Sequence, residues 1–370
     1  MELSFLRPVY ARPGPWSSVY LDASRNCEGA QTALELRWRG LAEELVSYGA
    51  DLSTVAALGD VVLGHEPLPG NYGFAAFAAD GQVGLAQYLA APPVKDLAAY
   101  APLPHTMPLI AQRGEQIPWV RVLADRTGAD VCAVSAGGVQ RRTTVAGGET
   151  FPLRRVEPGG WSQSHYQRAA VEAWHHNAGD VAKATVHAAE AVDAEVVVLA
   201  GDVRATGVLA AQLPERWQAR MVRTDAGARD IGADPSMLDD ITVQLVAEVA
   251  DEHIGRTLDR FGMQEEVGEG LDAVVEALRR AQVDTMLLVD DPSAVGELWI
   301  GPAPTDIALN RDALDGEAQR VRADAALVRA LVGTDAEINV LGPEEGPALT
   351  DGLGAVLRYT DAATPGTGRD

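Results

Sequence analysis

The sequence predicts a mixed α/β protein of three domains, on three observations. Its 370 residues are more than one hydrophobic core ordinarily serves. Helix-type and strand-type apolar patterns alternate along most of the chain, which favours helices packed on mostly central sheets. The charge changes in steps, with basic and acidic residues numbering 6 and 11 in 1–112, 13 and 12 in 113–223, and 11 and 30 in 224–370. We therefore predict three domains and a frayed tail, at 1–112, 113–240, 241–362 and 363–370.

The first domain has the pattern of an α+β unit. Strands are predicted at 17–22, 74–79 and 83–89. Asp80-Gly81 lies between the last two, and this pair is typical of a tight hairpin turn. A helix is predicted at 30–48, with its apolar face formed by Leu34, Leu41, Leu45 and Val46. Prolines at 92–118 indicate connecting turns that lead out of this domain.

The second domain is predicted to combine a short β-meander with a long helix. The expected meander strands are 119–124, 129–136 and 139–145. A loop follows, and then a helix with Ser162 as N-cap that Gly179 interrupts before it continues over 182–191. A buried parallel strand, a short helix and a last strand are expected at 195–201, 208–213 and 218–222.

The third domain repeats the alternation of helices and strands. Helices are predicted at 241–261, 271–281, 323–331 and 348–352. Strands are predicted at 285–289, 337–341 and 355–359. The pattern indicates another sheet covered by helices.

Composition excludes several classes of protein. No apolar run reaches the 18 or so residues of a membrane span, and the N-terminus lacks the features of a signal peptide. Cys27 and Cys132 stand far apart, so we expect two buried cysteines in a cytoplasmic protein without a disulfide framework. Motifs for nucleotide phosphates, hydrolase serines and metals are missing, and we predict no cofactor and no metal site.

The net charge of −23 argues against a broadly nucleic-acid-binding surface and against DNA as a partner. Only the near-neutral middle third is compatible with RNA. The acidic last third favours a protein partner, because phosphate would repel it.

One segment combines the residue types that bind RNA. Arg154 and Arg155 precede a loop whose bare glycine backbone can enter a narrow space. Arginines with an aromatic residue at the tip of a loop bind RNA through phosphate pairing and base stacking. The candidate residues are Arg154, Arg155, Gly159, Gly160, Trp161, Ser162 and Gln163. The alternative is an ordinary Pro-Gly turn with Trp161 folded back onto the core.

The helix that follows supplies further candidates on its polar side: His165, Arg168, His175 and His176. Adjacent helical residues point about 100° apart, so His175 and His176 do not share a face as two metal ligands would. We therefore expect them to contact RNA or solvent.

These residues resemble the middle domain of the archaeo-eukaryotic release factors. Those proteins carry Gly-Gly-Gln-Ser ahead of a long helix with an arginine, a glutamate and a His-Asn pair. The corresponding residues here are Pro158-Gly159-Gly160-Trp161-Ser162, Arg168, Glu172, His175-His176-Asn177 and Val181-Ala182. Similar motifs at 198–202, 271–288 and 352–359 extend the resemblance over about 115–360. It implies a ribonuclease H-like middle domain and a last domain built as an α/β/α sandwich, like kink-turn-binding ribosomal proteins.

Trp161 is a departure from that family. In release factors the glutamine at this position places the water that hydrolyses peptidyl-tRNA in the peptidyl-transferase centre. An indole has one N–H donor and no acceptor, so Trp161 cannot place water in that way. The resemblance therefore points to the non-hydrolytic branch, which contains Pelota-type rescue factors and bacterial Balon-type ribosome hibernation factors.

The leading prediction is a non-catalytic factor that occupies the ribosomal A site and blocks or protects idle ribosomes. By the resemblance, the first domain would face the decoding centre and the last would meet ribosomal proteins or elongation factor Tu. Charge alone suggests the decoding-centre contacts Arg7, Arg12, Arg37 and Arg39.

Two alternatives remain open. One is a peptidyl-tRNA hydrolase or rescue factor that uses Gln163 or Gln140. The other is a nuclease or a signalling adaptor, since a ribonuclease H-like fold binds catalytic metals through clustered acids at strand ends. Asp125, Asp130 and Asp202 are the candidate ligands.

Overall fold

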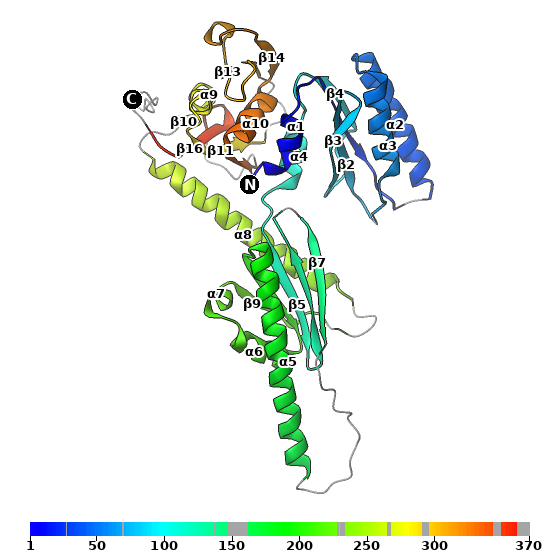
Figure 1. The fold of residues 1–370 in the computed structure, drawn as a ribbon, viewed down its shortest axis with the longest axis vertical. Coiled ribbons are helices and arrows are strands. Elements are labelled where there is room, and N and C mark those ends of the chain that lie inside the picture. Colours follow the sequence, from blue (N-terminus) through cyan, green and yellow to red (C-terminus); the bar gives the residue numbers. More distant parts are fainter. Residues whose placement is uncertain are drawn as a thin grey trace. The chain divides into compact units, whose positions relative to one another are not determined.

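The computed structural model describes residues 1–26, 28–68, 70–136, 138–146, 162–227, 229, 234–264, 268–290, 296–342 and 349–360; side chains within 162–176 are not among them. The chain has a mixed α/β fold with several sheets (Figure 1). Its residue contacts divide it into two compact units, one formed by 1–115 together with 256–370 and one by 116–255. The boundaries at 112 and 240 stay a prediction.

The first unit begins with a four-stranded antiparallel sheet in the order β3-β2-β1-β4. Its elements are η1 (Ser4–Leu6), α1 (Arg7–Tyr10), β1 (Trp16–Asp22), α2 (Ala30–Ser47), α3 (Leu52–Gly64), β2 (Gly73–Ala79), β3 (Gln82–Leu89), β4 (Leu97–Ala101) and α4 (Met107–Arg113). Alternation along β1 sends Val19 and Leu21 to one face and Tyr20 to the other. The helices α2 and α3 cover the first face with a core that includes Leu34, Leu45 and Leu58 (Figure 1).

The second part of the same unit has two small sheets, in the orders β10-β16-β11-β15 and β13-β12-β14. Its elements are β10 (Gly268–Glu269), α9 (Leu271–Arg279), β11 (Val283–Val289), β12 (Glu297–Ile300), β13 (Ile307–Ala308), η2 (Arg311–Ala313), β14 (Gln319–Arg322), α10 (Ala323–Thr334), β15 (Glu337–Leu341), η3 (Thr350–Gly352) and β16 (Leu353–Leu357). The strands β11 and β15 are parallel, and the other pairs of these sheets are antiparallel.

The two ends of the chain share one hydrophobic core in this unit. Leu6 and Val9 of the N-terminal helical turns belong to the same buried cluster as Leu327 and Leu331 of α10. The backbone N–H of Ile338 donates to the carbonyl of Met1 at 3.1 Å. The first and last parts of the sequence are therefore packed on each other.

The second unit contains a five-stranded sheet in the order β7-β6-β5-β8-β9. Its elements are β5 (Trp119–Asp125), β6 (Gly128–Val134), β7 (Gln140–Ala146), α5 (Ser162–Val192), β8 (Val196–Gly201), α6 (Val203–Gln212), α7 (Glu215–Gln218), β9 (Met221–Arg223) and α8 (Ser236–Met263), which continues into the first unit from Arg256. Antiparallel pairing joins β5, β6 and β7, while β8 is parallel to β5 and β9. One face packs on α5 and α6, and the other on α8.

The predicted meander and the buried parallel strand are confirmed by this sheet. Cys132 is buried with a free thiol, as predicted, whereas Cys27 lies outside the described residues. The predicted interruption at Gly179 is wrong, because α5 is continuous through it. Val46 is 44% exposed and does not join the apolar face of α2.

Several elements were misplaced or missed by the sequence patterns. Helix α3 and the strands β12 to β14 were not predicted, and β4 and α4 lie in the proline-rich stretch expected to form turns. The strand predicted at 218–222 is present but shorter and shifted, because α7 (Glu215–Gln218) ends at its predicted start and β9 runs over Met221–Arg223. The short helix predicted at 208–213 begins earlier, at Val203, because the Asp202 carboxylate caps its first turn. The helix predicted at 348–352 is described only as the 3-10 turn η3.

Candidate functional site

The predicted RNA-binding loop lies between β7 and α5. Five of its candidate residues lie outside the described part of the chain: Arg154, Arg155, Gly159, Gly160 and Trp161. Ser162 and Gln163 form the start of α5, and His165, Arg168, His175 and His176 lie further along the same helix. The structure describes the helical backbone of these six residues but not their side chains. Their roles remain predictions.

The helix that follows the loop is much longer than the sheet on which it packs. With 31 residues α5 is about 46 Å long, whereas the seven-residue strands of the sheet span about 23 Å. Its second half packs on the sheet through Val181, Ala182 and Ala189. The first half extends beyond the ends of β5, β6 and β7 (Figure 1). The residues nearest the loop are thus carried on a helical arm away from the core of this unit.

A hydrogen-bonded turn lies at the end of the sheet from which that arm extends. It joins β5 to β6, and the carboxylate of Asp125 accepts hydrogen bonds from the backbone N–H groups of Thr127 and Gly128 at 2.6 and 3.0 Å. The hydroxyl of Thr127 also donates to this carboxylate, at 2.7 Å. Gly128 is paired with Ala146, the last residue of β7 before the loop. This turn therefore lies beside the point where the loop leaves the sheet.

Arg229 connects the two carboxylates of that turn region. Its Nη1 donates to Asp125 and its Nε to Asp130, each at 3.0 Å. Burial alone would raise the pKa of Asp125, but the hydrogen bonds from Thr127 and the Arg229 charge outweigh burial and lower it. Burial likewise tends to lower the pKa of Arg229, while Asp130 and Asp125 raise it above its ordinary value. Asp125 and Arg229 are therefore held in their charged forms.

Asn177 fastens the helical arm to the same turn. Its side-chain amide is buried and donates to the carbonyl of Arg126 at 3.4 Å. Next to it, β8 ends at Gly201, which has φ of +105° and lies against β5. A Cβ at this glycine would come within 2.3 Å of the carbonyl oxygen of Ala124, so only glycine allows the two strands to approach this closely. Asn177 thus ties the base of the arm to the turn between β5 and β6, and Gly201 lets β8 pack closely on β5.

The acids considered as metal ligands are engaged otherwise. Arg229 bridges Asp125 and Asp130, and Asp202 caps α6 by accepting from the N–H groups of its first turn. A cation would have to displace the guanidinium to bind the first two carboxylates. Among the described residues, no group of three or more acids, histidines or cysteines is placed to hold a metal ion. This arrangement gives the nuclease hypothesis no support.

Two arginines that sequence reasoning missed lie on the strand that leads into the loop. Arg141 and Arg142 are exposed on β7, the edge strand of the sheet. The sequence signal that could have identified them is a basic pair within the polar strand Gln140–Ala146. Gln140 itself, one of the two glutamines considered for hydrolysis, donates from its amide to the sulfur of Cys132 at 2.9 Å. It lies at the end of β7 far from the loop, about 20 Å along the strand.

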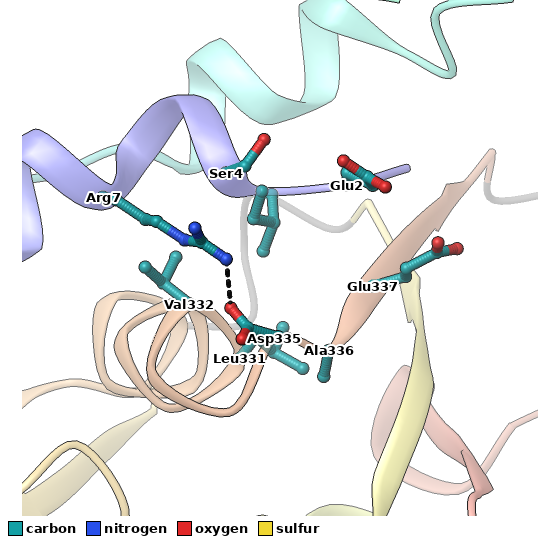
Figure 2. A pocket seen from close by; sticks show the side chains of 9 residues that line it. Glu2, Ser4, Arg7, Leu331, Val332, Asp335, Ala336 and Glu337 are labelled. Atoms are coloured by element: carbon teal, nitrogen blue, oxygen red, sulfur yellow. Dashed lines mark hydrogen bonds and ion pairs between the residues drawn. The ribbon is translucent and has the colours of Figure 1, made fainter. Parts of the chain in front are cut away.

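The arginines suggested for the decoding centre differ in their environments. Arg7 pairs with Asp335 at 2.6 Å, and Arg37 pairs with Asp22 and Asp96 at 3.1 and 3.5 Å. Arg12 and Arg39 are exposed. The Arg7–Asp335 pair borders a cavity of about 140 Å³ between the N-terminal turns and α10 (Figure 2). Ligand sites usually enclose about 300–1,000 Å³, so this cavity is better explained as a gap in packing.

Within the described ranges, no helix combines the length and the hydrophobicity that crossing a bilayer requires.

Comparison with known proteins agrees with the resemblance predicted from the sequence. Residues 118–268 match the family described as bacterial archaeo-eukaryotic release factor family 2. A full-length relative from Mycobacterium tuberculosis strain H37Rv, named as the uncharacterized protein Rv2629, is 29% identical over 97% of both chains. The corresponding protein of strain CDC 1551, MT2704, has the same identity and coverage. The segment 118–268 is thus similar to this bacterial release factor-like family.

Solved structures show more distant similarity. Archaeal Pelota, from a model of the ribosome-bound protein with ABCE1, is 14% identical over 96% of this chain and 93% of that one, with a TM-score of 0.39. Dom34, a translation termination-like factor of S. cerevisiae, is 11% identical over 80% and 81%, with a TM-score of 0.36. Pelota of Archaeoglobus fulgidus is 17% identical over 77% and 80%, with a TM-score of 0.33. Similarity at this level does not place the parts of this chain on those of the solved structures.

Proposed function

We propose that this protein is a non-catalytic ribosome-binding factor of the hibernation type, which occupies the A site of idle ribosomes. The observation that carries the proposal is Gly159-Gly160-Trp161-Ser162, which lies within the segment that matches the release factor family. At this position the release factors use glutamine to place the hydrolytic water. Tryptophan keeps a large stacking surface but offers one N–H donor and no acceptor. The loop would therefore bind RNA in the peptidyl-transferase centre without hydrolysis.

The helical arm suits a segment that enters a deep, narrow site. About half of α5 extends beyond the sheet, and the loop connects to its free end. At about 1.5 Å per residue, residues 162–176 carry the loop about 22 Å beyond the first packed residues. Arg154 and Arg155 within the loop, with Arg168 and the histidines of the arm, would neutralise rRNA phosphates along this path.

The other parts of the chain have proposed partners of different chemistry. Residues 1–112 would face the decoding centre, where the exposed Arg12 and Arg39 are the better candidates, since Arg7 and Arg37 pair with carboxylates. The acidic 241–362 would meet ribosomal proteins or elongation factor Tu. All these partners belong to the cytoplasm, where we expect the protein to act.

Co-sedimentation with vacant ribosomes tests the proposal. We expect the full-length protein to pellet with ribosomes at low salt, and Arg154→Glu with Arg155→Glu to weaken this binding. The matched control is Lys183→Glu with Arg204→Glu, which makes the same change in charge at two exposed residues of the same unit. Failure of the wild type to bind at low salt would refute the proposal. Equal binding by the two double variants would show that Arg154 and Arg155 of the loop do not contribute to ribosome binding.

A turnover assay separates this proposal from the hydrolase alternative. Gln163 belongs to the first turn of α5, two residues after Trp161, and this shift in register argues against its replacing the missing glutamine. With peptidyl-tRNA loaded on ribosomes we expect no hydrolysis above the rate without protein. Hydrolysis that disappears in Gln163→Ala would show instead that the protein is a release-type enzyme.

A further inference from the structure

The edge strand β7 has an exposed surface that the Gly-Gly-Trp loop does not explain. It covers Gln140–Ala146, and all but one of its side chains are exposed. It pairs with β6 on one side only, since it ends the sheet order β7-β6-β5-β8-β9. Within the described part of this unit, its other edge carries backbone N–H and C=O groups that pair with no strand. The strand contains arginine, threonine and glutamine but no acidic residue.

The two arginines of β7 differ from the four arginines of the same unit that pair with carboxylates. In the same unit, Arg121, Arg126, Arg216 and Arg229 each lie within 4.0 Å of a carboxylate. Within the parts of the chain that the structure describes, the only carboxylate bound by β7 is Asp130, which accepts from the hydroxyl of Thr144 at 2.8 Å. Among the residues that the structure describes, no carboxylate therefore neutralises the charges of Arg141 and Arg142.

The register of the sheet places these charges on both sides of the edge. Arg141 is opposite Ala133, which belongs to the core under α5, so Arg141 and Thr143 point to the α5 face. Arg142 is opposite Cys132 and points to the other face. A strand that presents a cation above and below one exposed edge can contact successive phosphates of a chain that passes along it. Guanidinium groups, threonine hydroxyls and backbone N–H groups are the usual donors to nucleic acid phosphates.

We propose that β7 binds the phosphate backbone of RNA, as a second contact beside the loop. The proposal rests on the ribosomal role proposed above, in which this RNA is ribosomal. Charge complementarity favours it over a peptide strand that would add to the same edge, because a peptide needs the backbone groups but not two adjacent arginines. The alternative explanation is that the charged side chains only keep this edge from pairing with other strands. In that case, removing the charges causes no loss of RNA binding.

The test compares Arg141→Gln with Arg142→Gln against the control Lys183→Gln with Arg204→Gln. Binding of the full-length proteins to vacant ribosomes is measured over a series of salt concentrations. Each lost phosphate contact lowers the slope of log K against log salt by about 0.7–0.9, so the β7 variant should lose about 1.5. Its affinity should fall several-fold, and the control should match the wild type. A β7 variant with the affinity and slope of the wild type overturns this inference and leaves the ribosomal role standing. A loss of affinity with an unchanged slope also overturns it, in favour of a peptide partner.

A second arm uses a short RNA duplex of arbitrary sequence, so that the two proposals can fail separately. If the wild type does not bind ribosomes, the ribosomal role fails, and the duplex decides the role of β7. Weaker duplex binding by the β7 variant than by the control then supports it. Equal binding by both variants, or none by the wild type, overturns it.

Discussion

Arg229→Ala is expected to loosen the base of the helical arm. The substitution removes the cation between Asp125 and Asp130 and leaves two carboxylates facing each other across the turn that follows β5. Asp125 keeps its hydrogen bonds from Thr127 and Gly128, so the turn itself should still form. The change should appear in the opening of β5, β6 and β7 rather than in the fold of the whole chain.

The expected magnitude follows from the exposure of the three groups. A hydrogen bond to a charged group contributes about 1.5–3 kcal/mol when buried and less than about 1 kcal/mol at the surface. The Arg229 side chain is 16% exposed, but those of Asp125 and Asp130 are 36% and 48% exposed. Solvent screening therefore reduces the two contacts to about 1–2.5 kcal/mol together.

Hydrogen exchange by mass spectrometry on the full-length protein measures this loss strand by strand. The control is Arg216→Ala, whose ion pair with Glu190 joins side chains that are 61% and 49% exposed and should cost less than about 0.5 kcal/mol. In Arg229→Ala the pKa of Asp125 should also rise, because the guanidinium helps to lower it in the wild type. That stabilisation is present above the unfolded pKa of about 3.8 and is lost as the pH falls through the lower folded pKa. Equal exchange in the two variants would refute the bridging role of Arg229.

Three further substitutions test the packing and the charge inside each unit. Gly201→Ala should lower the free energy of unfolding of the second unit by at least about 2 kcal/mol, because the new Cβ would lie 2.3 Å from the carbonyl oxygen of Ala124. Amide hydrogen exchange in β8 at the wild-type rate would contradict this. Leu199→Ala, at a fully buried position of β8, should cost about 2–5 kcal/mol by the same measurement, and a cost below about 1 kcal/mol would mean that the site is not well packed. Burial lowers the pKa of His105 below 6.5 although Asp324 lies 3.7 Å away, so the unfolded chain takes up the proton first. The first unit should therefore lose stability as the pH falls through 6.5. His105→Gln should flatten this dependence in urea unfolding, and an equally steep dependence in the variant would place the responsible group elsewhere.

Features that depend on residues close together in the chain could be predicted from their pattern. Runs of β-branched and small residues between turn signals predicted β5, β6, β7 and β8, because a half-buried strand needs only its own alternation and its flanking turns. Likewise, Gly159-Gly160-Trp161-Ser162 together with the Arg168 and His175-His176-Asn177 pattern after it indicated the release factor-like segment, because all these residues lie within one short stretch of the chain. Helix α3 was missed because its apolar residues do not alternate with polar ones at the helical period. Its helical form depends on packing against the sheet and on the cap by Asp51.

Contacts between residues far apart in the chain became visible only in the folded structure. Arg229 is separated by 104 residues from Asp125 and by 99 from Asp130, and no local pattern announces that it neutralises both. The shared core of the first and last parts of the chain is equally invisible in the sequence, because any buried leucine satisfies the same apolar pattern whichever partner it packs against. The same holds for β7: its two arginines are a plain basic pair in the sequence. They become a candidate RNA contact once the sheet leaves them on its edge without a carboxylate partner among the residues that the structure describes.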